Sequence, residues 1–177
     1  SACVPVRIVG SGFEPGRGER KLLKRNADIV AVEGPARATG EQFELFRRYL
    51  AARHDDGGMV TMDREAYDDM VESGVHGTML VEFRDAAGRL VGVSLTDRIA
   101  TGLSGVYKFF EPELERRSLG TFIILWHIAR AAELGLPYVY LGYWIRDCRK
   151  MAYKARFMPL EALRGAEWRP LDPATTG

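Results

Sequence analysis

The stretch SLGTFIILWHIARAAELGLPYVYLGYWIRDCRKMAYKARF, residues 118–157, organises the rest of the chain. Residues 119–134 are apolar almost all round, which predicts a helix buried inside a fold or against a sheet. Gly135 and Pro137 end that helix, and Tyr138–Leu141 is a continuous β-prone run typical of a buried strand. Because ligands of open α/β sheets bind beyond strand ends, we expect the functional site near the polar, basic and aromatic residues that follow.

The composition indicates an ordinary globular protein with one good core. The chain has 177 residues, of which 46% are hydrophobic and 28% charged. No apolar run reaches membrane-spanning length, and the start SACVPVRIVG does not resemble a signal peptide. Two cysteines fit a reducing compartment, so we expect a cytoplasmic protein without a membrane partner. A net charge of +1 gives no global argument for nucleic acid, and DNA is not an expected partner.

The first half of the chain alternates short strands with helices. Pro5 interrupts a strand over residues 3–9, which favours an edge position in a sheet. Thr39 and Gln42 fit a capping box and open an amphipathic helix that extends to about His54. The other expected elements are a basic helix over 17–27, a strand over 28–33 and a helix over 63–72.

The second half predicts an antiparallel meander followed by the buried helix. The meander strands are expected at 78–84, 90–96 and 103–110. After the buried helix and its strand, a short helix ends at Pro159 and a final short strand covers 168–171.

This order of elements predicts an acetyltransferase-like α/β fold, with a mixed, mostly antiparallel sheet flanked by helices. In that fold the third meander strand and the strand after the buried helix splay apart, and substrates meet in the gap. We divide the chain into an N-terminal segment (1–35), a catalytic domain (36–171) and a disordered tail (172–177).

The residues at the start of the buried helix indicate whether acetyl-coenzyme A would be the acyl donor. Acetyltransferases hold its pyrophosphate on backbone amides in a loop of Arg or Gln, two residues, Gly, one residue, then Gly or Ala. This chain offers Arg117 and Gly120 but places Phe122 at the last position. A different donor is therefore favoured, and a CoA-dependent N-acetyltransferase remains the alternative enzyme.

The motifs after the strand are more specific. Three segments closely resemble the arginyl-tRNA–protein transferase family, in particular its bacterial aspartate/glutamate leucyltransferase branch. They are Gly142–Phe157, which contains Lys150-Met-Ala-Tyr-Lys154, Leu119-Gly120 and Tyr138–Gly142. The resemblance covers nearly the whole chain. Further matching segments are Cys3–Arg7, Arg25–Asp28, Phe46–Leu50 with His54, and Val106–Phe110 with Pro112.

This resemblance implies transfer of an aminoacyl group, leucyl before arginyl, from charged tRNA to the α-amine of a protein beginning with Asp or Glu. The product would carry a destabilising N-terminus that leads to degradation. No metal or CoA cofactor is implied, because the aminoacyl ester is already activated. Family members carry an N-terminal cysteine cluster, and only Cys3 matches it here, so we expect no iron–sulfur or zinc site. A non-catalytic reader of acidic N-termini or of tRNA is the second alternative.

Two residues are candidates for the chemistry itself. Asp97, at the end of a meander strand, would accept a proton or anchor the amine, and the alternative is a turn-capping aspartate. Tyr107 would donate to the oxyanion or to the leaving ribose hydroxyl, and the alternative is a core tyrosine. His54, His76 and His127 show no metal-ligand spacing, and Cys148 is interpreted as structural.

The remaining candidates bind the two substrates that this reaction requires. An acidic acceptor needs a cation, for which Lys150, Lys154 and Arg156 are candidates, and the alternative is a solvated basic face. Tyr143, Trp144 and Tyr153 could stack on the terminal adenine of tRNA, although such residues are more often core. A basic helix face would contact the tRNA backbone, unless it is merely solvated, and consists of Arg17, Lys21, Lys24 and Arg25.

Overall fold

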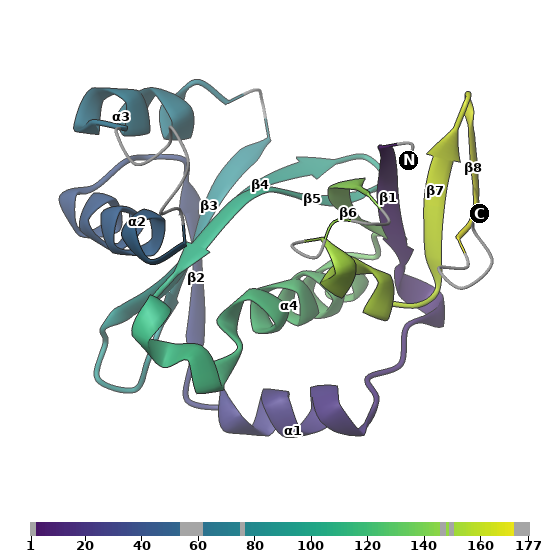
Figure 1. The fold of residues 1–177 in the computed structure, drawn as a ribbon, viewed down its shortest axis with the longest axis horizontal. Helices are drawn as coiled ribbons and strands as arrows, with labels where there is room; N and C mark the ends of the chain where they lie inside the picture. Colours follow the sequence, from purple (N-terminus) through teal and green to yellow (C-terminus); the bar gives the residue numbers. More distant parts are fainter. Residues whose placement is uncertain (1–2, 54–61, 75–76, 146–147, 149–150, 172–177) are drawn as a thin grey trace.

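The protein is built on one eight-stranded sheet with helices on both faces (Figure 1). The computed structural model describes residues 3–53, 62–74, 77–145, 148 and 151–171. The strand order is β2-β3-β4-β5-β6-β1-β7-β8, and every neighbouring pair is antiparallel except β5 and β6. The strands are β1 (Val4–Val9), β2 (Val30–Pro35), β3 (Thr78–Arg84), β4 (Leu90–Ile99), β5 (Gly102–Phe110), β6 (Tyr138–Trp144), β7 (Leu160–Arg164) and β8 (Glu167–Pro170).

The helices form two layers. Helices α2 (Gly40–Arg53) and α3 (Arg64–Glu72) cover one face of the sheet, whereas α4 (Leu119–Glu133) crosses the other face with α1 (Arg17–Arg25) outside it (Figure 1). The described residues also form three short 3-10 helices, η1 (Gly10–Gly12), η3 (Pro112–Arg117) and η4 (Ala152–Arg156). No helix within the described residues is long and apolar enough to cross a membrane.

The predicted acetyltransferase-like architecture is confirmed, and most elements begin and end close to their expected positions. Thr39 and Gln42 form the capping box, with Gln42 N donating to Thr39 Oγ1 at 3.3 Å and Thr39 N donating to Gln42 Oε1 at 3.1 Å. The apolar faces of α4 are buried against β5 and β6, so the helix is the centre of the core. Gly135 has φ +68 and ends α4 in the left-handed conformation that glycine adopts without strain.

The prediction for the first strand is wrong. β1 is an interior strand, paired with β6 on one side and with β7 on the other. Pro5 is tolerated because β7 pairs only with Val6–Ile8, so the missing N–H of Pro5 costs no hydrogen bond to β7. β7 itself was not predicted, because its five residues directly follow Pro159 and show too little alternation to signal a strand.

Candidate functional site

A cavity of about 720 Å³ opens where β5 and β6 part. The two strands pair only from Gly102 to Ser104 on β5, with Tyr138 to Tyr140 on β6. A Cβ on Gly102 would lie 2.2 Å from the carbonyl oxygen of Tyr138, so only glycine permits this close approach. Beyond Ser104 the strands diverge, as the acetyltransferase-like fold predicted. The end of α2, the start of α4 and η4 close the cavity.

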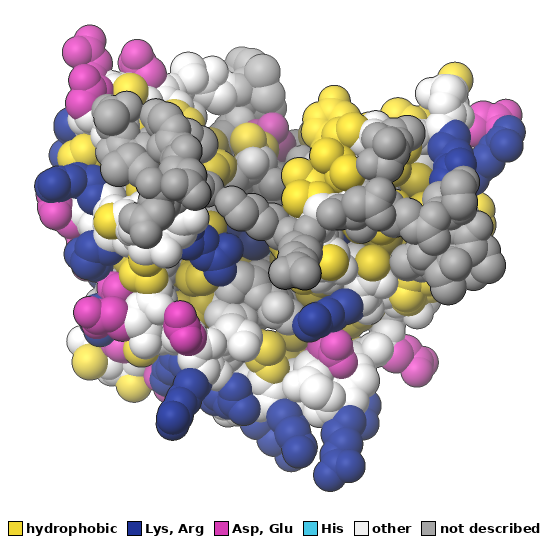
Figure 2. All heavy atoms as spheres, viewed as in Figure 1, with side chains coloured by type: hydrophobic (Ala, Val, Ile, Leu, Met, Phe, Trp, Pro, Cys, Tyr) yellow, Lys and Arg dark blue, Asp and Glu magenta, His cyan; other side chains and the backbone are white. Residues whose placement is uncertain are grey.

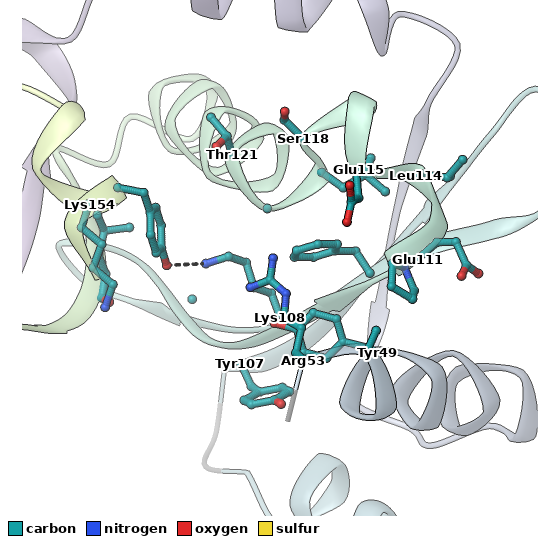
Figure 3. Close-up of a pocket in the computed structure, with 18 of the residues that line it drawn as sticks. Tyr49, Arg53, Tyr107, Lys108, Glu111, Leu114, Glu115, Ser118, Thr121 and Lys154 are labelled. Carbon is teal, nitrogen blue, oxygen red and sulfur yellow. Dashed lines mark hydrogen bonds between the residues drawn. The ribbon is translucent and has the colours of Figure 1, made fainter. Parts of the chain in front are cut away.

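Lys108 lies at the centre of this cavity and was not among the predicted residues. Because side chains alternate along β5, Tyr107 packs against Phe46 of α2 while Lys108 extends toward α4 and η4 (Figure 3). Lys108 Nζ donates to the hydroxyl of Tyr153 at 3.3 Å. Burial, reinforced by the nearby charges of Lys154 and Arg53, lowers the pKa of Lys108 to about 8.

Two further cations line the cavity from other elements. The guanidinium of Arg53, at the end of α2, lies 4.9 Å from the centre of the Phe110 ring and points into the cavity (Figure 3). Lys154 Nζ donates to the carbonyls of Leu141 at 2.8 Å and Tyr143 at 2.6 Å, which ties η4 to the part of β6 beyond its pairing with β5. Burial lowers the pKa of Lys154.

The carboxylates of the lining lie at the opposite end. Glu111 is 1% exposed, and its Oε2 accepts from Arg48 Nη2 at 3.0 Å and from Arg89 Nη2 at 2.8 Å. Glu115, from η3, is exposed at the rim. The positive charges near η4 are therefore not balanced by the described carboxylates of the lining.

The start of α4 forms the remaining wall. Ser118 adopts a left-handed conformation with φ 49 before the helix, and Gly120 faces the ring of Phe110, which a Cβ would meet at 3.1 Å. Phe122 turns away into the core against Phe83, and Arg117 pairs with Asp28 at 2.9 Å. Thus the ring of Phe110, rather than that of Phe122, packs against the start of α4.

The two predicted catalytic residues occupy different places. Tyr107 lines the cavity, and burial raises its pKa to about 12, so its hydroxyl stays protonated at neutral pH. Asp97 lies outside the lining, and its Oδ1 accepts a hydrogen bond from Thr78 Oγ1 at 2.5 Å. Tyr107 is therefore part of the cavity wall, with its ring turned toward Phe46 of α2 and away from Lys108 (Figure 3), whereas Asp97 is not part of the wall, and both roles stay predictions.

Only some of the predicted substrate-binding residues lie in the cavity. Lys154 and Tyr153 line the cavity, whereas Arg156 is exposed outside the lining and Lys150 lies outside the described residues. Tyr143 is 59% exposed beyond the end of the cavity, where its ring is accessible for stacking. Trp144 is 4% exposed and packs in the core, so its position matches the alternative of a core residue.

The four predicted tRNA-binding residues, Arg17, Lys21, Lys24 and Arg25, are exposed on α1. Figure 2 shows Lys and Arg side chains gathered along the lower edge of the molecule, where α1 lies in Figure 1. Arg25 Nη1 donates to the carbonyl of Arg116, and Asn26 Nδ2 donates to that of Arg117 at 2.9 Å. The basic helix is thereby fixed to the two residues that precede Ser118 at the cavity.

A buried polar cluster lies behind the cavity. His127 Nδ1 donates to the carbonyl of Ile123 at 2.7 Å, which leaves Nε2 to accept from Thr96 Oγ1 at 2.9 Å. His127 is 3% exposed, and burial lowers its pKa to about 4. It is a hydrogen-bonded core histidine, as the sequence favoured.

The side chains that commonly bind metals are dispersed over the described part of the fold. Among these residues, no group of three or more His, Cys, Asp or Glu side chains is placed to hold a metal ion. Cys3 is exposed and Cys148 partly buried, and both are free thiols.

A sheet that opens between two parallel strands over a buried helix defines this chain as a protein of the acetyltransferase-like class. The structure is similar to that of L-PGS from Bacillus licheniformis, with a TM-score of 0.52 and 12% sequence identity over 79% of this chain and 44% of that one. At this identity the likeness concerns the fold alone.

Sequence comparisons give the family. The model for "Arginine-tRNA-protein transferase, C terminus" matches residues 41–164. The aspartate/glutamate leucyltransferase of Gluconacetobacter diazotrophicus is 54% identical over 97% of this chain and 66% of its own length. That of Parvibaculum lavamentivorans is 55% identical over 95% of this chain and 70% of its own length. The chain belongs to the arginine-tRNA-protein transferase family.

Proposed function

We propose that this protein transfers an aminoacyl group, leucyl in preference to arginyl, from charged tRNA to the α-amine of proteins that begin with Asp or Glu. The modified proteins would carry a destabilising N-terminus and enter degradation. The observation that carries the proposal is the cation-lined cavity at the β5–β6 opening, in a chain about half identical to aspartate/glutamate leucyltransferases. Charged tRNA is made where proteins are synthesised, so the reaction belongs in the cytoplasm.

The reaction is the aminolysis of an ester. The acceptor nitrogen bonds to the aminoacyl carbonyl carbon, the bond from that carbon to the ribose oxygen breaks, and a proton moves from the nitrogen to the ribose oxygen. An α-amine has a pKa of about 7.7–8.0, so a useful fraction is neutral at pH 7. The ester is already activated and needs no metal or CoA. Positioning of the two substrates supplies most of the acceleration.

Tyr107 is the proposed hydroxyl donor for this step. Because its pKa is raised to about 12, it holds its proton and can donate to the developing oxyanion or to the leaving ribose oxygen. Asp97 remains the proposed proton acceptor, although it would have to act from outside the cavity lining.

The charge of the cavity supports leucine as the donor group. A bound arginyl side chain would bring a fourth cation near Arg53, Lys108 and Lys154. A leucyl side chain instead finds apolar surface in the same lining, from Leu119, Leu141 and Met151.

The position of α1 supports a path for the tRNA. Phosphates bound along its exposed basic face would lead to the residues held by Arg25 and Asn26, and from there to Ser118 at the cavity. The exposed ring of Tyr143 would stack on a base of the same tRNA.

One mass-spectrometry assay tests the proposal. The protein is incubated with leucyl-tRNA or arginyl-tRNA and with peptides that begin with Asp, Glu or Ala. A leucine-sized gain on the Asp and Glu peptides alone is the expected result. An arginine-sized gain would correct the donor. An acetyl-sized gain in a parallel incubation with acetyl-CoA, or no gain at all from folded protein, would refute the proposal.

A further inference from the structure

Arg53, Lys108 and Lys154 bring three positive charges into one cavity. Within the part of the chain that the structure describes, no ion pair joins any of the three to an acidic side chain. By contrast, Arg48 and Arg89 at the other end each form an ion pair with the buried Glu111. A partly buried cation without a counter-charge is unfavourable, so an anionic group at the η4 end of the cavity would be stabilised.

The three cations differ in how free their charged groups are. The ammonium of Lys154 already donates to two backbone carbonyls and holds β6 to η4. Arg53 is exposed at the rim, over the rings of Phe110 and Tyr49. Lys108 is the deepest of the three, and its hydrogen bond to the hydroxyl of Tyr153 is long at 3.3 Å.

We propose that Lys108 binds the side-chain carboxylate of the acceptor protein's first residue and thereby selects Asp and Glu, with the Tyr153 hydroxyl as the second donor. The inference rests on the proposed function and adds the residue that reads the acceptor. Because the Tyr153 oxygen accepts from Lys108, its own proton is free to point to a carboxylate oxygen.

The place of Lys108 favours the acceptor over tRNA as the source of this anion. The exposed cations of α1 lie outside α4, whereas Lys108 extends from β5 toward Tyr153 of η4 in the centre of the cavity. An acceptor with an Asn or Gln side chain would fill the same space and leave the ammonium without a counter-charge. A charged hydrogen bond contributes enough to separate the acid from its amide by about 10- to 100-fold in kcat/KM.

The test measures the ratio of kcat/KM for matched peptides, Asp against Asn and Glu against Gln, with leucyl-tRNA as donor. In Lys108→Met this ratio should fall at least about 10-fold, because transfer to the acidic peptides alone is weakened, and the KM for leucyl-tRNA should not change. Lys108→Arg should retain most of the preference, because the charge is kept. Tyr153→Phe should lower the ratio to a smaller extent.

Lys154→Met is the matched control, since it removes a second cavity cation whose bonds are structural. It should weaken transfer to acid and amide peptides equally and leave the ratio unchanged. If Lys154→Met removes the preference and Lys108→Met does not, the inference is wrong and Lys154 reads the acceptor. A rise in the KM for leucyl-tRNA in Lys108→Met, with both peptides affected alike, would assign Lys108 to a tRNA phosphate instead and also overturn it.

Failure of the proposed function gives a different result. In that case the wild-type protein transfers nothing to any peptide, and both conclusions fall together. Should Lys108→Met be poorly folded by circular dichroism, Lys108→Gln and Tyr153→Phe provide the same comparison of peptide pairs.

Discussion

His127 of α4 and Thr96 of β4 are joined across the core, with 2.9 Å between Nε2 and Oγ1. The bond requires an unprotonated Nε2 if Thr96 is to donate, and burial holds the pKa of His127 at about 4 against an ordinary 6.5. The unfolded chain therefore takes up this proton at a higher pH than the folded protein does. Stability from this group is complete above pH 6.5 and is lost as the pH falls toward 4.

This linkage predicts a decrease of about 3 kcal/mol in the free energy of unfolding between pH 6.5 and 4. The measurement is urea denaturation of the wild type and of His127→Gln across that range, because other titrating groups cancel in the difference. A constant difference between the two proteins would show that His127 is protonated in the folded state.

Lys108 gives a second pH dependence, in the choice of acceptor. Its pKa of about 8 means that it is charged below pH 8 and neutral above, and it is surrounded by Arg53 of α2, His127 of α4, and Tyr153 and Lys154 of η4. The kcat/KM ratio of Asp over Asn peptides, in which titration of the α-amine cancels, should decline above about pH 8. A ratio that stays level to about pH 10 would contradict this expectation.

The two ion pairs of Glu111 predict that mutations of its partners have non-additive effects on the free energy of unfolding. Arg48→Met or Arg89→Met alone leaves the buried carboxylate one partner, and each should cost roughly 1 kcal/mol. The double variant leaves it with neither and should cost about 3–5 kcal/mol by urea denaturation. Arg47→Met, which breaks only an exposed pair with Glu44, is the control and should change stability by less than about 0.5 kcal/mol. If the double variant loses only the sum of the two single losses, water must already stabilise the charge of Glu111.

The basic face of α1 predicts a change in salt dependence. Replacing Arg17, Lys21 and Lys24 with Gln, while keeping Arg25 on the Arg116 carbonyl, should weaken tRNA binding without moving the acceptor preference. The slope of log K against log salt should become shallower by roughly 0.7–0.9 for each phosphate that the helix no longer binds. Arg47→Gln serves as the surface control. An unaltered slope would make this face plain solvated surface.

Two glycines of β5 test the close approach that opens the cavity. Gly102→Ala forces a methyl group onto the Tyr138 carbonyl, whereas nothing lies within 4 Å of a Cβ on Gly105. Thermal unfolding should show a decrease in stability of about 1–3 kcal/mol or more for Gly102→Ala and of no more than about 0.5 kcal/mol for Gly105→Ala. Equal effects would mean that the strands part without needing this contact.

The sequence predicts the fold well wherever local signals and packing agree. The capping box at Thr39, the alternation of 78–84 and the apolar helix after Ser118 each specify one structure, and the structure contains all three. Pro5 was misleading, because proline limits a strand only on the side where its N–H would bond, and partners along a sheet are not encoded locally.

The site was harder to predict because its charges are defined by what surrounds them. Lys108, in the run Val-Tyr-Lys-Phe-Phe, looks like a lysine on the solvent face of an ordinary strand. Two features of the sequence pointed to a functional role for Lys108: it alternates with the buried Phe109, and it lies on the strand expected to diverge from its parallel neighbour. Only the folded structure shows that η4 packs over it. Trp144 is the opposite case. It stands among polar and basic residues in the sequence, which suggested a binding role, but its side chain packs in the core.

The interior place of β1 bears on how the protein is made. Val4–Val9 leave the ribosome long before their partners, which begin at residue 138 on β6 and at residue 160 on β7. At about 5–20 residues per second, this interval is on the order of 10 s, during which Val6 and Ile8 have no sheet to enter. The nascent chain therefore carries an unpaired apolar strand until β6 has been synthesised, and premature termination before that point would leave an aggregation-prone fragment.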